Sequence, residues 1–320
     1  MRTAFTDLVG CSVPIQQAPM GPVASAELAI AVAQAGGVGT ITAMGMSADE
    51  LAARLDDMCA QTDGALSANF LTEDIDEQAV AAAAQRIRLI DFFWVTPRAT
   101  LVDAVHRAGA LAGWQVGSLE EARTAVDAGC DVVTVQGIEA GGHVRGYQPL
   151  LPLLCDVLDH IDVPVLAAGG IAHARAVAAM LAAGAAGVRI GTRFIATPES
   201  GAHPAYKQAI VDAGTDATVI SDAFAICPLC ATNPRVQVLR SAAERVAEFA
   251  GQNVGEAPMR GVSTPLPAGV GLPPFVSVTG HVDAMALYAG QAVNLVNGIQ
   301  PAGDVVASLM SHAERQAQQQ

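Results

Sequence analysis

Charged residues are scarce in this chain, and basic residues are the scarcer kind. Only 15% of the 320 residues are charged, and 31 acidic residues outnumber 17 basic ones, of which Lys207 is the single lysine. The formal net charge is −14. A protein that binds a nucleic-acid backbone needs a basic face, so we expect no nucleic-acid partner. The hydrophobic content of 52% excludes a disordered chain, because disorder requires low hydrophobicity and high charge.

Cysteine is also scarce, with six residues in the whole chain. So few cysteines over this length exclude a small domain held together by disulfides. Cys227 and Cys230 form one CxxC pair, but a structural zinc site needs four ligands and the sequence has no second pair. We therefore expect no metal and interpret the pair as ordinary thiols. The N-terminus lacks the pattern of a signal peptide, so the chain is expected to be cytoplasmic.

Unbroken apolar runs are missing as well. The longest uncharged stretch covers residues 28–48, which is long enough to span a bilayer by length alone. The pair Gly36-Gly37 interrupts it at a position where a helix would stop. The stretch divides better into a helix that ends near Ala35 and a buried strand that starts at Val38. We therefore predict no membrane span.

The chain instead contains a regular alternation of two kinds of segment. Short runs that are apolar on both faces alternate with Ala-rich amphipathic stretches at intervals of roughly 20–25 residues. The apolar runs, interpreted as strands, are Pro14–Met20, Val38–Met44, Ala65–Leu71, Leu89–Val95, Leu111–Val116, Asp131–Gln136, Val163–Ala168 and Gly187–Ile190. The amphipathic stretches, interpreted as helices, are Ala26–Ala35, Ala48–Cys59, Glu77–Ile87, Thr100–Ala108, Leu119–Ala128, Leu150–His160 and Ala174–Ala183.

Ala-Gly pairs close several of these helices, because glycine readily takes the left-handed conformation that ends a helix. The pairs are Ala35-Gly36, Ala108-Gly109, Ala128-Gly129 and Ala183-Gly184. Eight strands with helices between them predict an α/β fold, the (β/α)8 TIM barrel. The alternative is an open doubly wound sheet, which usually has a GxGxxG turn after its first strand. Met20-Gly21-Pro22-Val23 stands there instead, so we prefer the barrel.

The alternation stops after Ile195, which indicates a change of structure. We predict a TIM barrel over residues 1–214 and a smaller C-terminal excursion of loops and short helices over 215–290. A last amphipathic helix within 291–320, roughly Ala302–Arg315, is expected to pack back on the barrel. The excursion is expected to act as a lid over the substrate, with Phe224, Met259 and His281 as candidate lid residues by composition.

The loop after the sixth strand carries the first candidate for chemistry. TIM-barrel activity gathers at the C-terminal ends of the strands. The sixth strand ends at Gln136, and Gly141, Gly142 and His143 follow in one short loop. The glycines allow backbone amides to approach a ligand closely. A histidine at the barrel mouth can remove a proton from a carbon acid near neutral pH, and this framing favours that role for His143 over a surface histidine.

The loops after the seventh and eighth strands predict a phosphate site. They contain Gly169-Gly170 and the run from Arg189 through Ile190 and Gly191 to Thr192. TIM barrels commonly bind phosphate between these two loops, where glycine amides and a hydroxyl can donate hydrogen bonds. Arg189 could add positive charge, and Asn69, at the end of the third strand, could bond either a ligand or a neighbouring loop. With His143 at the mouth, this pattern favours FMN as the cofactor.

At these residues the sequence resembles the nitronate monooxygenase family, formerly called 2-nitropropane dioxygenases, which are FMN-dependent TIM-barrel enzymes. The resemblance runs from Gln17–Gly21 to Tyr288–Val293 and is most specific at residues 135–143, 167–171 and 190–194. It implies that His143 is the catalytic histidine. It also implies that the following residues contact the flavin: Ala18, Pro19, Met20, Asn69, Gln136, Gly141, Gly170, Arg189, Ile190, Gly191 and Thr192. A Gln often stands in the family where this chain has Arg189.

The resemblance further implies a reaction. An alkyl nitronate, such as propionate 3-nitronate, would be oxidised by O2 to a carbonyl compound and nitrite, and a neutral nitroalkane would first lose its α-proton to His143. Flavin-dependent enoyl-ACP reductases and NAD(P)H:quinone reductases share this scaffold, so NAD(P)H-dependent reduction is the alternative. A non-catalytic flavin-binding protein is the second alternative, although it would have no reason to place His143 at the mouth. The apolar surplus leaves a homodimer open.

Overall fold

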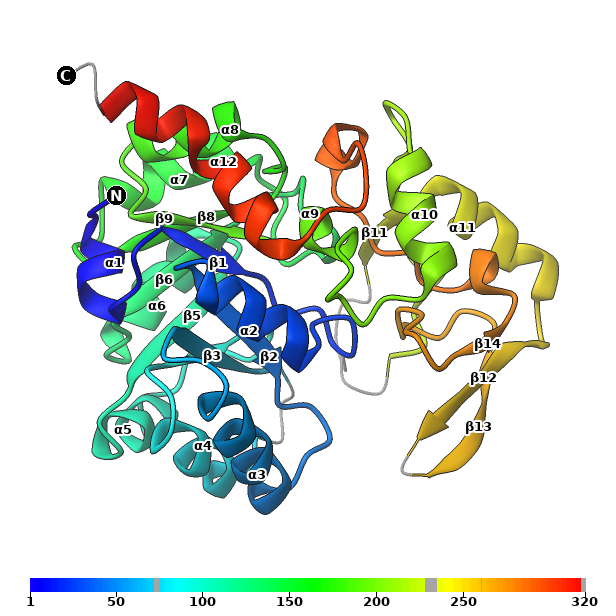
Figure 1. Ribbon diagram of the computed structural model, residues 1–320, viewed down its shortest axis with the longest axis horizontal. Coiled ribbons are helices and arrows are strands. Elements are labelled where there is room, and N and C mark those ends of the chain that lie inside the picture. The colour runs from blue at the N-terminus through cyan, green and yellow to red at the C-terminus, as the bar shows by residue number, and fades with distance from the viewer. Residues whose placement is uncertain (72–74, 228–234, 260, 318–320) are drawn as a thin grey trace.

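The computed structural model describes residues 1–71, 75–227, 235–259 and 261–317. Its centre is a closed barrel of parallel strands in the order β1-β2-β3-β4-β5-β6-β8-β9, and β9 pairs with β1 to close it. This confirms the predicted TIM barrel (Figure 1). The barrel strands are β1 (Ile15–Gln17), β2 (Val38–Thr42), β3 (Ala65–Phe70), β4 (Leu89–Phe92), β5 (Leu111–Val116), β6 (Val132–Gln136), β8 (Val165–Ala168) and β9 (Gly187–Ile190).

Helices cover the outside of the barrel, and most of them start with a side-chain cap. Ser47 and Glu50 form a reciprocal capping box at the start of α3, as their spacing in the sequence allows. The helices of the barrel region are α1 (Ala4–Val9), α2 (Ala26–Gln34), α3 (Ala48–Cys59), α4 (Glu77–Ala84), α5 (Ala99–Arg107), α6 (Leu119–Asp127), α7 (Leu150–Leu158), α8 (Ala174–Ala182), α9 (Thr192–Ile195) and α10 (Pro204–Asp212). The C-terminal helix α12 (Ala302–Ala317) crosses α8 and α2 (Figure 1).

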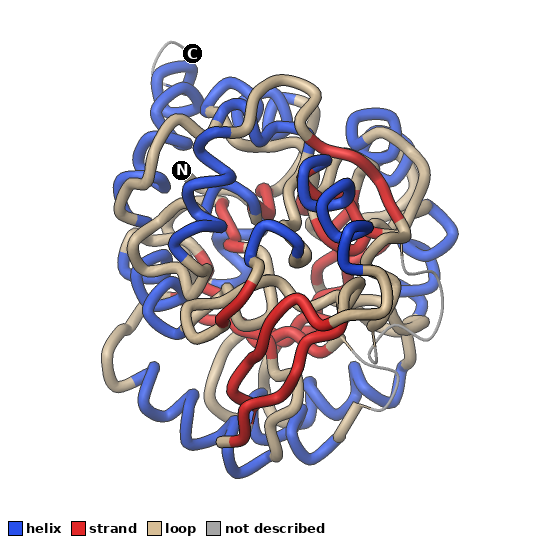
Figure 2. Tube along the Cα trace, turned by 90° about the vertical axis from the view of Figure 1, so that its right-hand side faces the viewer, coloured by secondary structure: helices blue, strands red, loops and turns tan. Residues whose placement is uncertain are grey.

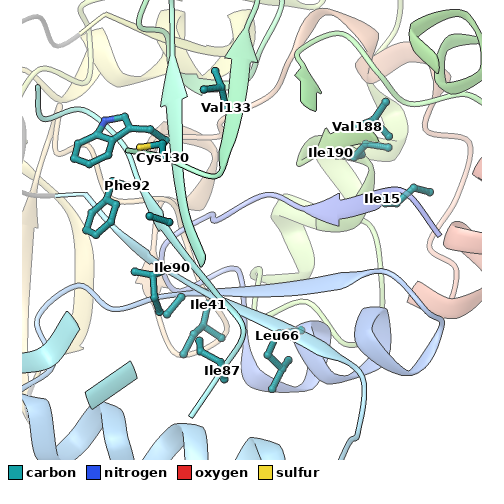
Figure 3. Packing of buried hydrophobic residues seen from close by; sticks show 14 of the residues in the cluster. Ile15, Ile41, Leu66, Ile87, Ile90, Phe92, Cys130, Val133, Val188 and Ile190 are labelled. Carbon is teal, nitrogen blue, oxygen red and sulfur yellow. The ribbon is translucent and has the colours of Figure 1, made fainter. Parts of the chain in front are cut away.

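Apolar side chains pack between the strands and the helices. In β4, Ile90 and Phe92 point outward into this layer, and Phe92 stacks on Trp114 of β5 with ring centroids 4.6 Å apart (Figure 3). Leu89, which precedes Ile90, belongs instead to a cluster at the N-terminal end of the barrel, where Phe5 of α1 joins Val38, Leu111, Val132 and Leu166. The two-residue alternation expected for strands therefore separates an outer layer from an inner one.

The interior of the barrel is polar at mid-height, contrary to the prediction that each strand is apolar on both faces. Gln16, Ser67, Asp91 and Arg189 are almost fully buried there. The Gln16 amide donates to the Asp91 carboxylate at 2.6 Å, although β1 and β4 are not neighbouring strands, so this hydrogen bond crosses the interior. These polar groups are stable in the interior because they bond one another.

The chain after α10 contributes strands to two small sheets, one of which also includes β7 from the loop after β6, rather than only the expected loops and short helices. One sheet has the order β10-β11-β7 and the other β13-β12-β14, and the β12–β13 hairpin projects from the body (Figures 1 and 2). The elements are β7 (Gly142–His143), β10 (Thr218–Ser221), β11 (Val236–Leu239), α11 (Arg240–Val246), η1 (Ala247–Phe249), β12 (Asn253–Met259), β13 (Val262–Pro267), β14 (Thr279–Gly280), η2 (Val282–Ala284) and η3 (Gln291–Leu295).

A second hydrophobic cluster holds this part of the chain together. It joins Tyr206 and Ile210 of α10 to Val236 and Val238 of β11 and to Leu287. The barrel segment contributes Ile195 to the same cluster. The predicted domain boundaries stay a prediction. Among the described residues, no helix is both long and apolar enough to cross a membrane.

Candidate functional site

A cavity of about 610 Å³ lies at the C-terminal mouth of the barrel. The barrel supplies one wall and the C-terminal excursion supplies the other, through residues such as Leu266, Val270 and Tyr288. The structure brings every candidate catalytic and flavin-contacting residue to this one cavity: Ala18, Pro19, Met20, Asn69, Gln136, Gly141, Gly142, His143, Gly169, Gly170, Arg189, Ile190, Gly191 and Thr192. Their placement follows from the barrel, which gathers the ends of all its strands at one rim.

Backbone pairing holds His143 in place. It lies in β7, and it pairs with Val236 of β11. The side chain of Gln136 secures the same loop, since its Nε2 donates to the carbonyl oxygen of His143 at 2.9 Å and its Oε1 accepts from the Arg145 amide at 2.9 Å. The excursion therefore positions the candidate catalytic residue, a contribution that sequence reasoning missed.

Two aromatic rings enclose the His143 imidazole. The ring of Trp94 meets it edge-on at a centroid distance of 5.4 Å, and the ring of Tyr288 does so at 5.7 Å. This burial lowers the pKa of His143 to about 4. The imidazole is therefore neutral at pH 7, as a general base must be, although a low pKa also makes it a weak base.

Trp94 has an unusual backbone for so large a residue. Its φ of +76° lies in the left-handed region, which bulky side chains rarely adopt. The Arg145 guanidinium lies 5.5 Å from the centre of its indole ring and donates to its carbonyl oxygen at 2.9 Å. Sequence reasoning missed Trp94, because nothing in the pattern of the fourth strand distinguishes it from a core aromatic residue.

Glycines shape the part of the cavity wall next to the His143 loop. Gly169 and Gly170 have φ values of +114° and +65°, which favour glycine. A Cβ atom on Gly170 would also lie 3.1 Å from the Cβ of Glu139. The Thr192 hydroxyl accepts a hydrogen bond from the Gly290 amide at 3.0 Å and keeps its own proton to donate. This rim thus combines exposed backbone with a hydroxyl, as an anion site requires.

The guanidinium of Arg189 is directed into the barrel, which corrects the expectation that it faces a phosphate. Its Nη2 bonds Asp91 Oδ1 at 2.5 Å, and its remaining bonds go to Gln16 and Gln115. Its side chain is 1% exposed and that of Asp91 is 0% exposed. Arg189 therefore belongs to the cavity floor, where Asp91 compensates its charge. Asp91 is 98 residues from Arg189 in the sequence, so no local sequence pattern could predict this pair.

Two further arginines that follow barrel strands, Arg145 and Arg193, have other surroundings. Arg145 pairs with Glu121 at 2.7 Å, and Arg193 opens on a different cavity. Of the candidate lid residues, Met259 lines the mouth cavity, whereas Phe224 is buried in the second hydrophobic cluster and His281 packs on Phe249.

Three further residues line the cavity, and the sequence nominated only Asn69 among them as a ligand contact. Asn69, for which a ligand and a loop were both open, donates through Nδ2 to the carbonyl oxygen of Asp91 at 3.3 Å and still lines the cavity. The buried hydroxyl of Thr42 lines it too, and has no hydrogen-bond partner among the described residues. Cys227 also lines it, whereas Cys230 lies outside the described residues.

Comparison with known proteins gives the family. The model of the family described as nitronate monooxygenase matches residues 2–88 and 76–312. The chain belongs to the nitronate monooxygenase family. This confirms the resemblance found in the sequence. Among solved structures, FabK from Thermotoga maritima superposes with a TM-score of 0.81 at 27% identity, covering 100% of this chain and 98% of that one. Nitroalkane oxidase from Streptomyces ansochromogenes gives 0.79 at 26% identity, covering 98% and 100%.

Within the family, several curated relatives are oxidoreductases by name. A nitronate monooxygenase from Pseudomonas aeruginosa is 30% identical over 66% of this chain and 74% of its own length. The (3aS,4S,5R,7aS)-5-hydroxy-7a-methyl-1-oxo-octahydro-1H-indene-4-carboxyl-CoA dehydrogenase of Mycobacterium tuberculosis is 36% identical over 69% of this chain. That match covers 63% of the dehydrogenase, so the chain spans less than two thirds of this relative.

Proposed function

We propose that this protein is an FMN-dependent enzyme that oxidises alkyl nitronates with O2 to a carbonyl compound and nitrite. The supporting observation is that the buried imidazole of His143 and the glycine backbone at residues 169–170 lie on neighbouring parts of the wall of one largely apolar cavity. We further propose that the enzyme acts in the cytoplasm on a small-molecule substrate, alone or as a homodimer.

The residues around the cavity fit FMN. Gly169 and Gly170 line the cavity with left-handed backbone that a side chain would strain, and the buried Thr42 hydroxyl offers a hydrogen bond to a polar ligand. The backbones of Gly169, Gly170, Gly191 and Thr192 would hold the phosphate. The ring would be bordered by Ala18, Pro19, Met20, Asn69, Gln136, Gly141, Gly142, Arg189 and Ile190. When bound there, FMN supplies an electron acceptor for the substrate.

The low pKa of His143 favours a nitronate over a neutral nitroalkane. A nitronate is already an anion, so it reacts without losing a proton to the protein. A neutral nitroalkane must give its α-proton to His143, and burial lowers the basicity of that imidazole. The apolar side chains of Leu266, Val270 and Tyr288 on the excursion side suit a short alkyl chain.

Anaerobic reduction of the purified protein tests the proposal. We expect a yellow protein that releases FMN on denaturation and whose flavin absorbance is bleached by propionate 3-nitronate but not by NADH or NADPH. Rapid bleaching by NADH or NADPH, with none by the nitronate, would instead assign the protein as an NAD(P)H-dependent reductase. A colourless protein that does not take up added FMN would contradict both.

A second candidate is dehydrogenation of a hydroxylated acyl-CoA. Its support is the 36% identity to the dehydrogenase whose name specifies a bicyclic hydroxyacyl-CoA. The same anaerobic assay separates it from the first proposal, because a hydroxyacyl-CoA would then bleach the flavin and the nitronate would not.

A further inference from the structure

A second cavity, of about 440 Å³, lies beside the barrel rim and apart from the mouth. It lies where the start of α8, the short helix α9, the segment after η3 and one face of α12 meet. Ala172 lines both cavities, so the two are close neighbours. The proposed function makes no use of this second cavity, which we call the α8–α12 cleft.

The α8–α12 cleft concentrates positive charge in an acidic protein. Arg175, Arg193 and Arg315 line it together with His173 and His312. No aspartate or glutamate belongs to its lining within the described part of the chain. The whole protein has 31 acidic residues against 17 basic ones, so a chance sample of its surface would contain more acidic than basic groups. A concave surface lined by one sign of charge attracts ions of the opposite sign.

Arg193 is a buried cation with no counter-ion among the residues that the structure describes. It is 7% exposed, and its guanidinium donates only to neutral oxygens: Ala196 O and Gly298 O at 3.4 Å and Gln300 Oε1 at 2.5 Å. Within the described residues, no carboxylate lies within ion-pair distance of it. Burial removes water from the guanidinium and thereby lowers the pKa of Arg193. An anion in the cleft would compensate the buried charge.

Arg189 provides an internal comparison. It is also buried, and there the chain supplies Asp91 at 2.5 Å. The same fold thus pairs one buried arginine with a carboxylate, whereas the other lines a cleft without a counter-ion among the described residues. Because burying an unpaired charge costs free energy, the position of Arg193 indicates that the cleft binds a ligand of negative charge.

Other groups in the cleft add donors around Arg193. The Nδ1 of His173 accepts from the Arg175 amide at 3.1 Å, which places the proton of the neutral imidazole on Nε2. Along α12, Leu309 forms an apolar base, and Ser308 and His312 lie beside it on the same face. The cleft therefore offers guanidinium, imidazole and hydroxyl donors within one volume.

We propose that the α8–α12 cleft is a phosphate-binding site for a small molecule, separate from the flavin cavity. Guanidinium groups bind phosphate through paired hydrogen bonds, and a phosphate dianion compensates more of this charge than a single carboxylate would. The volume of about 440 Å³ accommodates a diphosphate. The site does not depend on the proposed redox reaction, so the failure of one proposal leaves the other intact.

Calorimetric titration of the FMN-saturated protein with pyrophosphate tests the site. We expect one equivalent to bind, and the double variant Arg175→Gln/Arg315→Gln to raise the Kd by at least about tenfold. Both residues are exposed, so the fold should survive their replacement, as circular dichroism can check. The matched control, Arg54→Gln/Arg107→Gln, makes the same charge change at exposed positions on α3 and α5 and should leave the Kd within about twofold.

Three results would overturn the proposal. They are the absence of binding at millimolar pyrophosphate, an equal loss of affinity in the control variant, and pyrophosphate binding only when FMN is removed, which would place the anion in the flavin cavity. A parallel titration with ADP identifies the source of the phosphate. Much tighter binding of ADP than of pyrophosphate assigns the cleft to the phosphate end of a nucleotide-bearing ligand, and equal binding assigns it to a free inorganic anion.

Discussion

Gly113 and Asp91 face each other inside the barrel on the neighbouring strands β5 and β4, and a Cβ atom on Gly113 would lie 2.6 Å from Asp91 Oδ1. That carboxylate oxygen is the one that bonds Arg189. The missing side chain at residue 113 therefore leaves the space in which a buried ion pair forms beneath the candidate flavin site. Several predictions about stability depend on this arrangement.

Replacing Gly113 with alanine should displace the Asp91 carboxylate from Arg189. We expect the free energy of unfolding to fall by about 2–4 kcal/mol, because overpacking and a weakened buried ion pair act together. Urea unfolding measures this change. Gly214→Ala is the control, since no atom lies within 4 Å of a Cβ there, and it should change stability by less than about 0.5 kcal/mol. Similar losses of unfolding free energy in both variants would show that Asp91 does not need the space beside Gly113.

The ion pair itself can be tested with a double-mutant cycle. Asp91→Asn leaves the Arg189 charge buried without its counter-ion, and Arg189→Gln does the same to Asp91. Each single variant should lose about 3–5 kcal/mol of stability, and the double variant should be more stable than the less stable single one. Additive losses in urea unfolding would mean that the two side chains do not depend on each other.

The pH dependence of stability should carry a contribution from His143. Its folded pKa of about 4 is below the ordinary value of 6.5, so the unfolded chain binds the proton more readily. Burial of the neutral histidine therefore costs no stability above about pH 6.5. As the pH falls toward 4, the free energy of unfolding should decrease by up to about 3 kcal/mol. His143→Gln should lack this loss. Stability curves of the two proteins that run parallel between pH 7 and pH 4 would contradict the prediction.

Turnover of neutral nitroalkanes should depend on His143 more strongly than turnover of nitronates does. His143→Ala should lower kcat/KM for a neutral nitroalkane by about 10²–10⁴-fold, the usual contribution of a general base, and should change nitronate turnover much less. Steady-state oxygen consumption measures both. Equal losses on the two substrates would mean that His143 acts on a step that they share.

Substituting a glycine of the rim should weaken flavin binding beyond any general loss of stability. Gly170→Ala forces a side chain onto a backbone with φ of +65° and against Glu139, so we expect FMN affinity to fall by at least about tenfold. Gly129→Ala introduces the same kind of strain, at φ of +95°, beyond the end of α6 and far from the cavity. It should cost comparable stability yet leave the Kd for FMN unchanged in a fluorescence titration. A matching loss of affinity in Gly129→Ala would make the effect one of stability alone.

The barrel and the membership of its rim could be predicted from local pattern. The alternation of apolar runs and helices requires only nearby residues, and a parallel barrel brings all its strand ends to one rim. Gln136, His143 and the glycines at 169–170 could be nominated on that ground, and all of them line one cavity. The strands of the excursion could not be predicted, because β11 pairs with β7 and β10, segments that are distant or irregular in sequence.

The sequence by itself therefore determined the order of strands and helices, the glycines that permit positive φ, and the strand ends that form the rim. Tertiary structure alone decided the surroundings of the reactive groups. Asp91 and Arg189 are 98 residues apart, and Trp94 and Tyr288 approach His143 from opposite parts of the chain. The charge state of a buried group depends on such distant neighbours, since they exclude water or supply a counter-ion, and no local pattern of residues encodes them.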